Sequence, residues 1–218
     1  MPIWISTAYL TSAYLVGSIP WGYLIVKLFT GKNIQNIESG RTGGTNTMRA
    51  AGFAAGLATT VLDILKSAGV VWIGRSFFPQ AYWLHVIAAL LSVLGHNYSI
   101  FLLRISPEGK IDLGGGAGGT PTIGGLIGFW WPVALLVLPI GAVIIFVIGY
   151  ASLATMTMPL LGSLILAYRA IRFGTPWEYA VFGLLAEVLI LWALRPNIKR
   201  LIHGSERVVG LRAKEDRE

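Results

Sequence analysis

Long apolar stretches separated by short polar segments dominate the chain. Between Thr11 and Leu28 the only charged residue is Lys27, and between Pro121 and Tyr168 there is none. Apolar runs of about 18 residues or more are typical of transmembrane helices. The pattern predicts spans over about 4–29, 52–73, 82–103, 122–135, 137–150, 156–168 and 177–194. We therefore expect an all-α integral membrane protein with about seven transmembrane helices.

Prolines and one polar run set the expected helix breaks. Pro20 should interrupt the first span, because proline removes a backbone donor and kinks a helix. The apolar stretch from Ile123 to Tyr168 is too long for one membrane-spanning helix at about 1.5 Å per residue. We expect it to break at Pro132, at Pro139 and at the polar run 151–157 that Pro159 closes.

The composition excludes several classes of protein. Hydrophobic residues make up 55% of the chain and charged residues 12%, with a mean hydropathy of +0.68, whereas a soluble domain is about a quarter charged. Seven spans would leave no room for a separate soluble domain, so we expect a single transmembrane domain over 1–218. The chain has no cysteine, which excludes disulfides and thiolate catalysis. Its three histidines lie far apart, and we expect neither a metal nor a cofactor.

The net charge of +7 is distributed unevenly. If the N-terminus is outside, the first loop (about 30–50), the second loop (about 104–120) and the tail (195–218) share the inner face. They then hold most of the Lys and Arg residues, and only Arg75, Arg169 and Arg172 lie outside. Cytoplasmic loops of membrane proteins carry such an excess of cations, so we expect a cytoplasmic C-terminus and no nucleic-acid partner. No basic region precedes the first span, so we expect no cleavable signal peptide.

The first loop is rich in hydrogen-bond donors. It contains Glu38-Ser39-Gly40-Arg41-Thr42-Gly43-Gly44-Thr45-Asn46-Thr47-Met48-Arg49. Glycines let the backbone adopt positive φ and approach a ligand closely. Many donors with few acceptors suit an oxyanion such as phosphate. The alternative is a flexible polar loop that happens to be rich in small residues.

The second loop is a weaker candidate for the same chemistry. It ends in Lys110-Ile-Asp-Leu-Gly-Gly-Gly-Ala-Gly-Gly-Thr120 and leads directly into an expected helix. Glycine N–H groups before a helix N-terminus can form a phosphate cradle. No Gly-Lys-Ser/Thr follows, so the pattern is not a Walker A motif. A simple linker is the alternative.

Three further features carry charge or polarity. The basic tail fits an anchor for anionic lipid headgroups, which does not explain Asn197. Asp63 and Lys66 lie three residues apart within a span and should pair with each other, because a lone charge in hydrocarbon is costly. His96, near the inner end of the third span, fits a satisfied interfacial histidine better than a catalytic base.

Several motifs match one known family in order and spacing. They are Gly17-Ser-Ile-Pro-Trp-Gly-Tyr-Leu-Ile25, Ser39-Gly-Arg-Thr-Gly-Gly-Thr-Asn-Thr-Met-Arg49, Leu62-Asp-Ile-Leu-Lys66, Gly95-His96, Ser152-Leu-Ala-Thr155 and Asn197-Ile-Lys-Arg-Leu-Ile-His-Gly-Ser-Glu206. Over nearly its whole length the chain resembles the bacterial PlsY-type acyl-phosphate:glycerol-3-phosphate acyltransferases. The resemblance implies a seven-helix protein of the bacterial plasma membrane with its active site at the cytoplasmic face.

The resemblance also implies a reaction and the residues that perform it. An acyl chain would move from acyl phosphate to the sn-1 hydroxyl of glycerol 3-phosphate, giving lysophosphatidic acid and phosphate, with the acyl tail between helices or in the bilayer. The implied catalytic residues are Ser39, Arg49 and Asn197. The implied phosphate-binding residues are Gly40, Arg41, Thr45, Asn46, Gly115, Gly116, Gly118, Gly119 and Thr120. The implied supporting residues are Asp63, Lys66, His96 and Glu206.

Departures from the family pattern leave the activity open. Both lysines of the family's glycine-rich motif are absent, and Ala117 stands where one of them is expected. Leu194 replaces a histidine, and Arg41 replaces an asparagine and could restore positive charge. A working acyltransferase, a paralogue with another donor or acceptor, and a non-catalytic lipid- or phosphate-binding protein all remain candidates. A transporter fits less well, because the polar segments all fall on one side.

Overall fold

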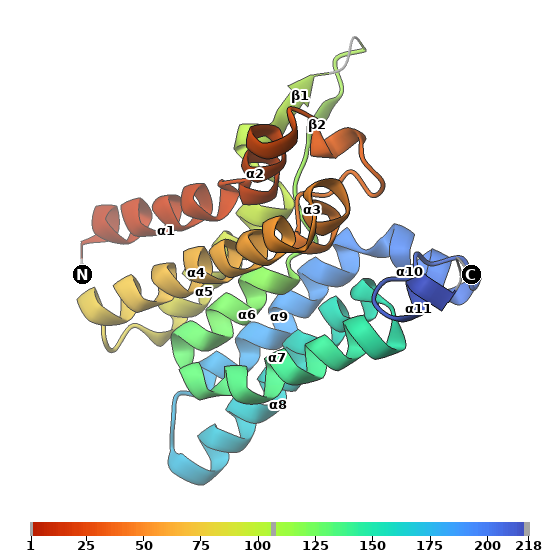
Figure 1. Ribbon diagram of the computed structural model, residues 1–218. Helices are drawn as coiled ribbons and strands as arrows, with labels where there is room; N and C mark the ends of the chain where they lie inside the picture. The colour runs from red at the N-terminus through yellow and green to blue at the C-terminus, as the bar shows by residue number, and fades with distance from the viewer. Residues whose placement is uncertain (1, 106–107, 216–218) are drawn as a thin grey trace.

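The computed structural model describes residues 2–105 and 108–215. Eight helices form an elongated bundle, and three shorter helices and a hairpin lie around it (Figure 1). The bundle consists of α1 (Ile3–Ser18), α2 (Trp21–Thr30), α4 (Phe53–Phe77), α5 (Tyr82–Asn97), α6 (Gly119–Phe129), α7 (Ala134–Val143), α8 (Ala151–Phe173) and α9 (Glu178–Ala193). The smaller elements are α3 (Gly44–Ala51), α10 (Arg195–Ile202), α11 (Arg212–Glu215) and the antiparallel pair β1 (Leu103–Ile105) and β2 (Ile111–Leu113).

The predicted helical membrane class is confirmed, but the described residues contain fewer full-length spans than seven. Five segments are long and apolar enough to cross a membrane: Ile3–Thr30, Phe53–Phe77, Tyr82–Leu102, Trp131–Ile148 and Ala151–Phe173. A sixth results if α9 and α10, which meet at a 73° bend, are counted together. The remaining candidate, α6, has 11 residues. At about 1.5 Å per residue it covers roughly half of the hydrocarbon thickness.

Small residues let the bundle helices approach closely. A Cβ on Gly124 of α6 would lie 2.2 Å from the carbonyl oxygen of Ile64 in α4, and one on Gly17 of α1 would lie 2.3 Å from that of Ser92 in α5. Such contacts between backbones are typical of membrane helices, which associate by packing rather than by the hydrophobic effect. Large apolar side chains on the outside, such as Ile171 and Leu164, are exposed and suit contact with lipid.

Two of the predicted helix breaks are correct and two are wrong. The break at Pro20 is confirmed, because α1 ends at Ser18 and α2 begins at Trp21. The turn at Pro132 is also present, in a short 3-10 helix. Pro139 and Pro159, however, lie inside α7 and α8.

The polar run 151–157 was expected as a break but forms the start of α8. The preceding break lies at Gly149, whose φ of 89° ends the π-helical segment Ile144–Ile148. The Thr155 and Thr157 hydroxyls donate to the carbonyls of Ala151 and Leu153, at 2.8 and 2.9 Å. Threonine is therefore satisfied within the helix, and proline inside a membrane helix is tolerated when neighbouring groups compensate.

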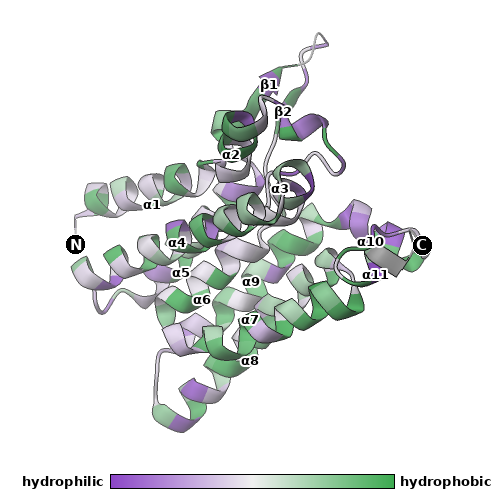
Figure 2. Cartoon of the chain, viewed as in Figure 1, coloured by the Kyte–Doolittle hydropathy of each residue, from purple (hydrophilic) through white to green (hydrophobic). Residues whose placement is uncertain are grey.

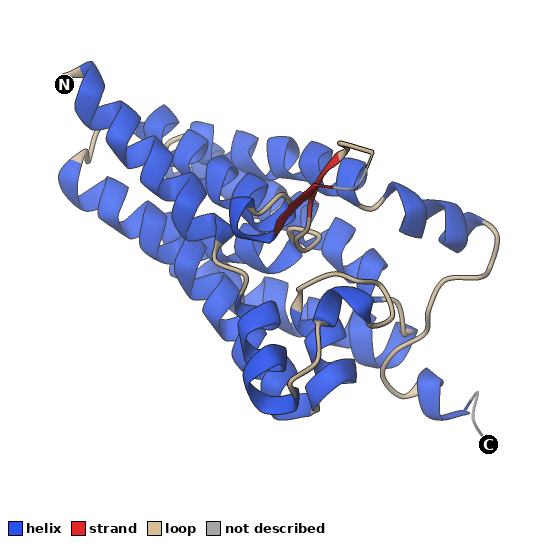
Figure 3. Cartoon of the chain, turned by 90° about the horizontal axis from the view of Figure 1, so that it is seen from above, coloured by secondary structure: helices blue, strands red, loops and turns tan. Residues whose placement is uncertain are grey.

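The two loops and the tail gather at one end of the bundle, here called the polar end. Thr42 in the first loop donates its N–H to the carbonyl of Gly115 in the second, at 3.1 Å. The N-terminus lies at the opposite end from the C-terminus (Figure 3). Hydrophilic residues are concentrated in α10 and around the hairpin, whereas the middle of the bundle is mainly hydrophobic (Figure 2). The expected clustering of polar segments on one side is confirmed.

Candidate active site

The first loop has a defined fold with its own hydrogen bonds. Its second half forms α3, which the sequence interpretation treated as loop. The Asn46 side chain donates its Nδ2–H groups to the carbonyls of Ile37 at 3.0 Å and Arg41 at 2.9 Å. Asn46 was expected to bind phosphate, but these bonds use the donors of its amide to hold the loop. It is therefore better described as a residue that shapes the site.

The glycines of the second loop fit closely against the end of α5. The Gly116 N–H donates to the His96 carbonyl at 2.8 Å, and the Ser99 N–H donates to the Gly114 carbonyl at 2.9 Å. Gly118 has a φ of 93°, and α6 begins at the next residue. The predicted passage from glycines into a helix is confirmed. The first N–H groups of a helix have no acceptor within it, so Gly119 and Thr120 offer free amides to an anion.

The two loops, α8 and the tail enclose a polar cavity of about 120 Å³. Eleven of the expected site residues line it: Ser39, Arg41, Thr45, Asn46, Arg49, His96, Gly118, Gly119, Thr120, Asn197 and Glu206. Gly40, Gly115 and Gly116 instead line a neighbouring cavity, which Ser39 and Arg41 also reach. Three of the expected phosphate-binding glycines are therefore set apart from the others.

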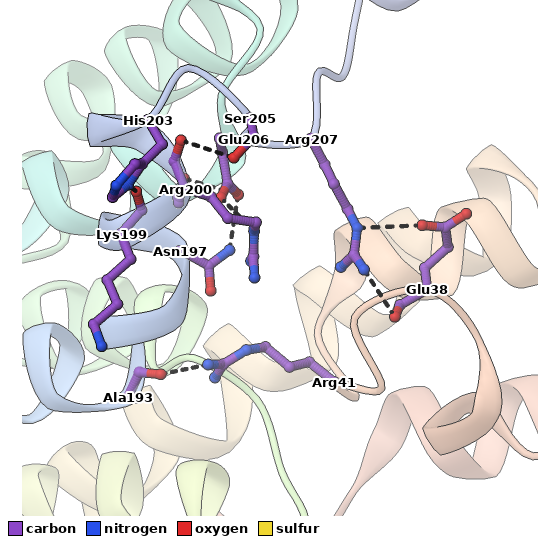
Figure 4. Close-up of polar contacts among 11 residues, drawn as sticks. Glu38, Arg41, Ala193, Asn197, Lys199, Arg200, His203, Ser205, Glu206 and Arg207 are labelled. Carbon is purple, nitrogen blue, oxygen red and sulfur yellow. Dashed lines mark hydrogen bonds and ion pairs between the residues drawn. The ribbon is translucent and has the colours of Figure 1, made fainter.

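Arg41 connects the two loops with the end of α9. Its guanidinium donates from Nη1 to the Gly116 carbonyl at 2.9 Å. It also donates from Nη2 to the Ala193 carbonyl (Figure 4). Burial lowers the pKa of this guanidinium from its ordinary value, but arginine remains protonated in proteins. A guanidinium has five N–H donors, and these two bonds use only two of them. Arg41 can therefore still bind an anion.

Glu206 organises the tail. Its carboxylate accepts a bond from Asn197 Nδ2 at 2.8 Å and pairs with Arg200 Nε at 3.0 Å (Figure 4). Ser152 Oγ also donates to this carboxylate, at 3.3 Å. The side chain is largely buried, so a paired carboxylate is required there. The expected supporting role of Glu206 is consistent with these contacts. They also fix the position of Asn197 beside the cavity.

An ion pair joins the tail to the first loop. Arg207 Nε lies 3.4 Å from Glu38 Oε2, and Arg207 Nη2 donates to the Glu38 carbonyl at 3.1 Å (Figure 4). Within the described part of the chain, Glu38 is the only non-glycine residue with positive φ, at 49°. Both partners are exposed enough for solvent to weaken the pair.

This strain gives a stability prediction. We expect Glu38→Gly to be more stable than Glu38→Ala by about 1 kcal/mol, because both lose the carboxylate but only glycine adopts the left-handed conformation without cost. Chemical denaturation of the two purified variants in the same detergent measures the difference. Equal stability would contradict strain at this position.

An apolar groove of about 320 Å³ continues from the polar cavity. The two share residues of α3, α6 and α8, namely Gly44, Thr45, Gly119, Thr120, Ala151 and Thr155. The rest of the groove is lined mainly by apolar side chains of α4, α7 and α8, including Leu57, Leu138 and Met158. A charged group and a hydrocarbon chain of one ligand could therefore be bound side by side.

The expected pairing of Asp63 and Lys66 is confirmed beneath the cavity. Lys66 Nζ lies 2.8 Å from Asp63 Oδ1, and both side chains are buried. His96 Nδ1 lies 3.4 Å from the same oxygen. Within residues 2–105 and 108–215, no group of three or more His, Asp or Glu residues could hold a metal ion.

Comparisons with known proteins match most of the chain. Residues 7–204 match the family described as "Glycerol-3-phosphate acyltransferase". The chain belongs to this family. It is 37% identical over 202 residues to a glycerol-3-phosphate acyltransferase of Thermus thermophilus, covering 92% of this chain and 94% of the relative. A relative of the same name from Syntrophomonas wolfei is 36% identical, with coverage of 91% and 94%.

Solved structures agree with the family assignment. The crystal structure of PlsY, an integral membrane glycerol 3-phosphate acyltransferase, in its glycerol 3-phosphate form superposes with a TM-score of 0.81 at 30% identity, covering 94% of this chain and 96% of that one. The lysophosphatidic acid form of PlsY gives a TM-score of 0.80 at the same identity. This member of the glycerol-3-phosphate acyltransferase family is thus a multi-pass integral membrane protein.

Two residues that depart from the family motifs lie in the wall of the polar cavity. Ala117 and Leu194, which stand where a lysine and a histidine are expected, both line the polar cavity. The sequence interpretation missed Arg207, Gly43, Gly44 and Thr155 as cavity residues. Gly43 and Gly44 lie within a quoted motif and could have been included. Arg207 carries no local signal, because only the return of the tail toward the first loop brings it to the cavity.

Proposed function

We propose that this acyltransferase moves an acyl chain from acyl phosphate to the sn-1 hydroxyl of glycerol 3-phosphate at the cytoplasmic face of the bacterial plasma membrane. The products are lysophosphatidic acid and phosphate. One observation supports acyl phosphate as the donor. A cavity lined by Arg41, Arg49 and helix N-terminal amides continues into an apolar groove, which suits a phosphate joined to a hydrocarbon chain.

The residues divide between the two substrates. Ser39, Arg49 and Asn197 bind glycerol 3-phosphate on the side formed by the first loop and the tail. The start of α6, with Gly118, Gly119 and Thr120, binds the phosphate of the donor, assisted by Arg41 and Thr45. Gly40, Gly115 and Gly116 shape this arrangement from the neighbouring cavity. The acyl chain occupies the groove between α4, α7 and α8.

The chemistry requires positioning and charge stabilisation more than a protein nucleophile. The substrate hydroxyl attacks the acyl carbon, a new ester bond forms and the carbon–oxygen bond to phosphate breaks. The proton of the hydroxyl leaves with the phosphate, whose oxygens can accept it. Acyl phosphate is already activated, so the reaction needs no acyl-enzyme intermediate.

Release of phosphate from palmitoyl phosphate tests this function. Full-length protein in lipid nanodiscs is assayed with and without glycerol 3-phosphate, and lysophosphatidic acid is measured in parallel. We expect release that depends on the acceptor and matches lysophosphatidic acid formation. If folded protein releases no phosphate from this donor, an enzyme with another acyl donor would be favoured, because Ala117 provides no cation for the donor phosphate.

Arg41 should contribute to donor binding. We expect Arg41→Asn to raise the KM for palmitoyl phosphate about 10- to 100-fold, since a hydrogen bond to a charged group contributes about 1.5–3 kcal/mol. The KM for glycerol 3-phosphate should change much less. Lys32→Asn, which removes an exposed cation that lines neither cavity, is the matched control. An unchanged donor KM would show that Arg41 does not replace the missing lysine.

A further inference from the structure

The buried cluster of Asp63, Lys66 and His96 determines where His96 carries its proton. These side chains come from α4 and α5 and lie beneath the polar cavity, with exposed fractions of 0%, 8% and 4% for the three residues. Histidine can donate or accept at either ring nitrogen, and the partner of one nitrogen decides the state of the other. The contacts of Lys66 supply that partner.

The Lys66 ammonium has three close partners. Nζ lies 2.8 Å from Asp63 Oδ1, 2.9 Å from the Ile19 carbonyl oxygen and 3.1 Å from His96 Nδ1. An ammonium has donors and no acceptor, so Nδ1 must accept the hydrogen bond that joins the two nitrogen atoms. A hydrogen on Nδ1 would instead need Asp63 Oδ1 at 3.4 Å, and it would lie beside a buried cation. The single proton of a neutral ring therefore resides on Nε2.

The Nε2 atom faces Gly116 of the second loop. A Cβ on Gly116 would lie only 1.9 Å from it, so glycine is required where the ring approaches the loop. His96 lines the polar cavity together with Ala117 and Gly118. Among the residues that the structure describes, Nε2 has no hydrogen-bond partner, although Nδ1 has one. The ring of this cavity-lining residue thus has an unused N–H.

We propose that His96 is a catalytic residue that donates its Nε2–H to a phosphate oxygen of the acyl donor. This inference rests on the proposed function. As the acyl carbon–oxygen bond breaks, negative charge grows on the leaving phosphate, and a neutral imidazole N–H can stabilise it without giving up its proton. His96 then acts as a hydrogen-bond donor and not as a general base. It supplies a donor beside Ala117, whose side chain has none.

Two substitutions separate the Nε2 donor from the rest of the ring. His96→Gln can place an amide N–H near the Nε2 position, whereas the shorter His96→Asn places its amide near Nδ1. We expect His96→Asn to lower kcat/KM for palmitoyl phosphate roughly 10- to 100-fold and His96→Gln to stay within about fivefold of the parent. The KM for glycerol 3-phosphate should change less than threefold in both. Both variants should unfold at the same temperature as the parent protein. If they then lose kcat/KM for palmitoyl phosphate equally, the proposal is overturned.

Nitrogen-15 NMR of histidine-labelled, full-length protein tests the tautomer without an activity measurement. The chain has only His85, His96 and His203, and the His96→Asn spectrum assigns the signal. We expect a protonated Nε2, a bare Nδ1, and a shift of the Nε2 signal when inorganic phosphate is added. A proton on Nδ1, or no response to phosphate, would overturn the role of His96. Silence of the parent enzyme with palmitoyl phosphate would instead overturn the proposed function.

Discussion

Arg49→Ala is expected to lower kcat/KM for acyl transfer by about 10²- to 10³-fold. Arg49 lies in the last turn of α3 and lines the polar cavity, where we propose that it binds glycerol 3-phosphate. Removing one donor that stabilises charge in a transition state typically costs about 2.7–4 kcal/mol. Partial desolvation beside the cavity lowers the pKa of this otherwise exposed guanidinium, which still stays charged. Initial rates at varied glycerol 3-phosphate and palmitoyl phosphate measure the effect.

The side chain of Arg49 is exposed, so its loss should leave the fold intact. Arg172→Ala is the matched control, because it removes an exposed arginine from the last turn of α8, far from the cavity. We expect this control to retain parent activity. Full turnover in Arg49→Ala would exclude the proposed role of Arg49 in binding glycerol 3-phosphate. If the parent protein shows no turnover with any donor, a non-catalytic protein would be favoured instead.

Gly115→Ala is expected to reduce activity about 100-fold and to lower the free energy of unfolding by about 1–3 kcal/mol. The added Cβ would lie 2.3 Å from the Asn97 carbonyl oxygen and 2.4 Å from that of His96. These are backbone atoms at the end of α5 and cannot rotate away. The second loop must therefore move, which displaces the start of α6 from the cavity. Activity assays and denaturation of the purified variant measure the two effects.

The neighbouring Gly114→Ala provides a control with the same chemical change. Its Cβ would meet Gln35 Nε2 at 2.3 Å, which is the end of a flexible side chain that can move. We expect activity within about threefold of the parent. If both alanine variants are equally impaired, the effect comes from stiffening the glycine run and not from the contact with α5.

Local patterns were enough to predict the bundle and part of the site. Long apolar runs indicate membrane helices because hydrocarbon tolerates few charges. The three-residue spacing of Asp63 and Lys66 places both on one helix face, and their pairing follows from the cost of a lone buried charge. The glycines before α6 predicted a loop that ends at a helix N-terminus, as the structure shows.

Features that depend on distant contacts could not be predicted in the same way. Arg207 reaches the cavity only because the tail turns back and pairs with Glu38, far away in sequence. Asn46 looks like a ligand donor in the sequence, but three-dimensional folding brings carbonyls of its own loop within reach. Pro159 was interpreted as a break because the proline rule describes an isolated helix and not one supported by neighbours.

The continuity between the polar cavity and the apolar groove has a consequence for product release. Leu57, Leu138 and Phe146 line the groove, and their side chains are exposed on helices that are apolar enough to contact lipid. Moving a hydrocarbon chain into water costs about 0.8 kcal/mol per methylene, so a long-chain lysolipid that departed through the aqueous mouth would face a prohibitive barrier. Sideways diffusion into the surrounding leaflet avoids that barrier. When this release limits the rate, turnover should increase with the fluidity of the host bilayer.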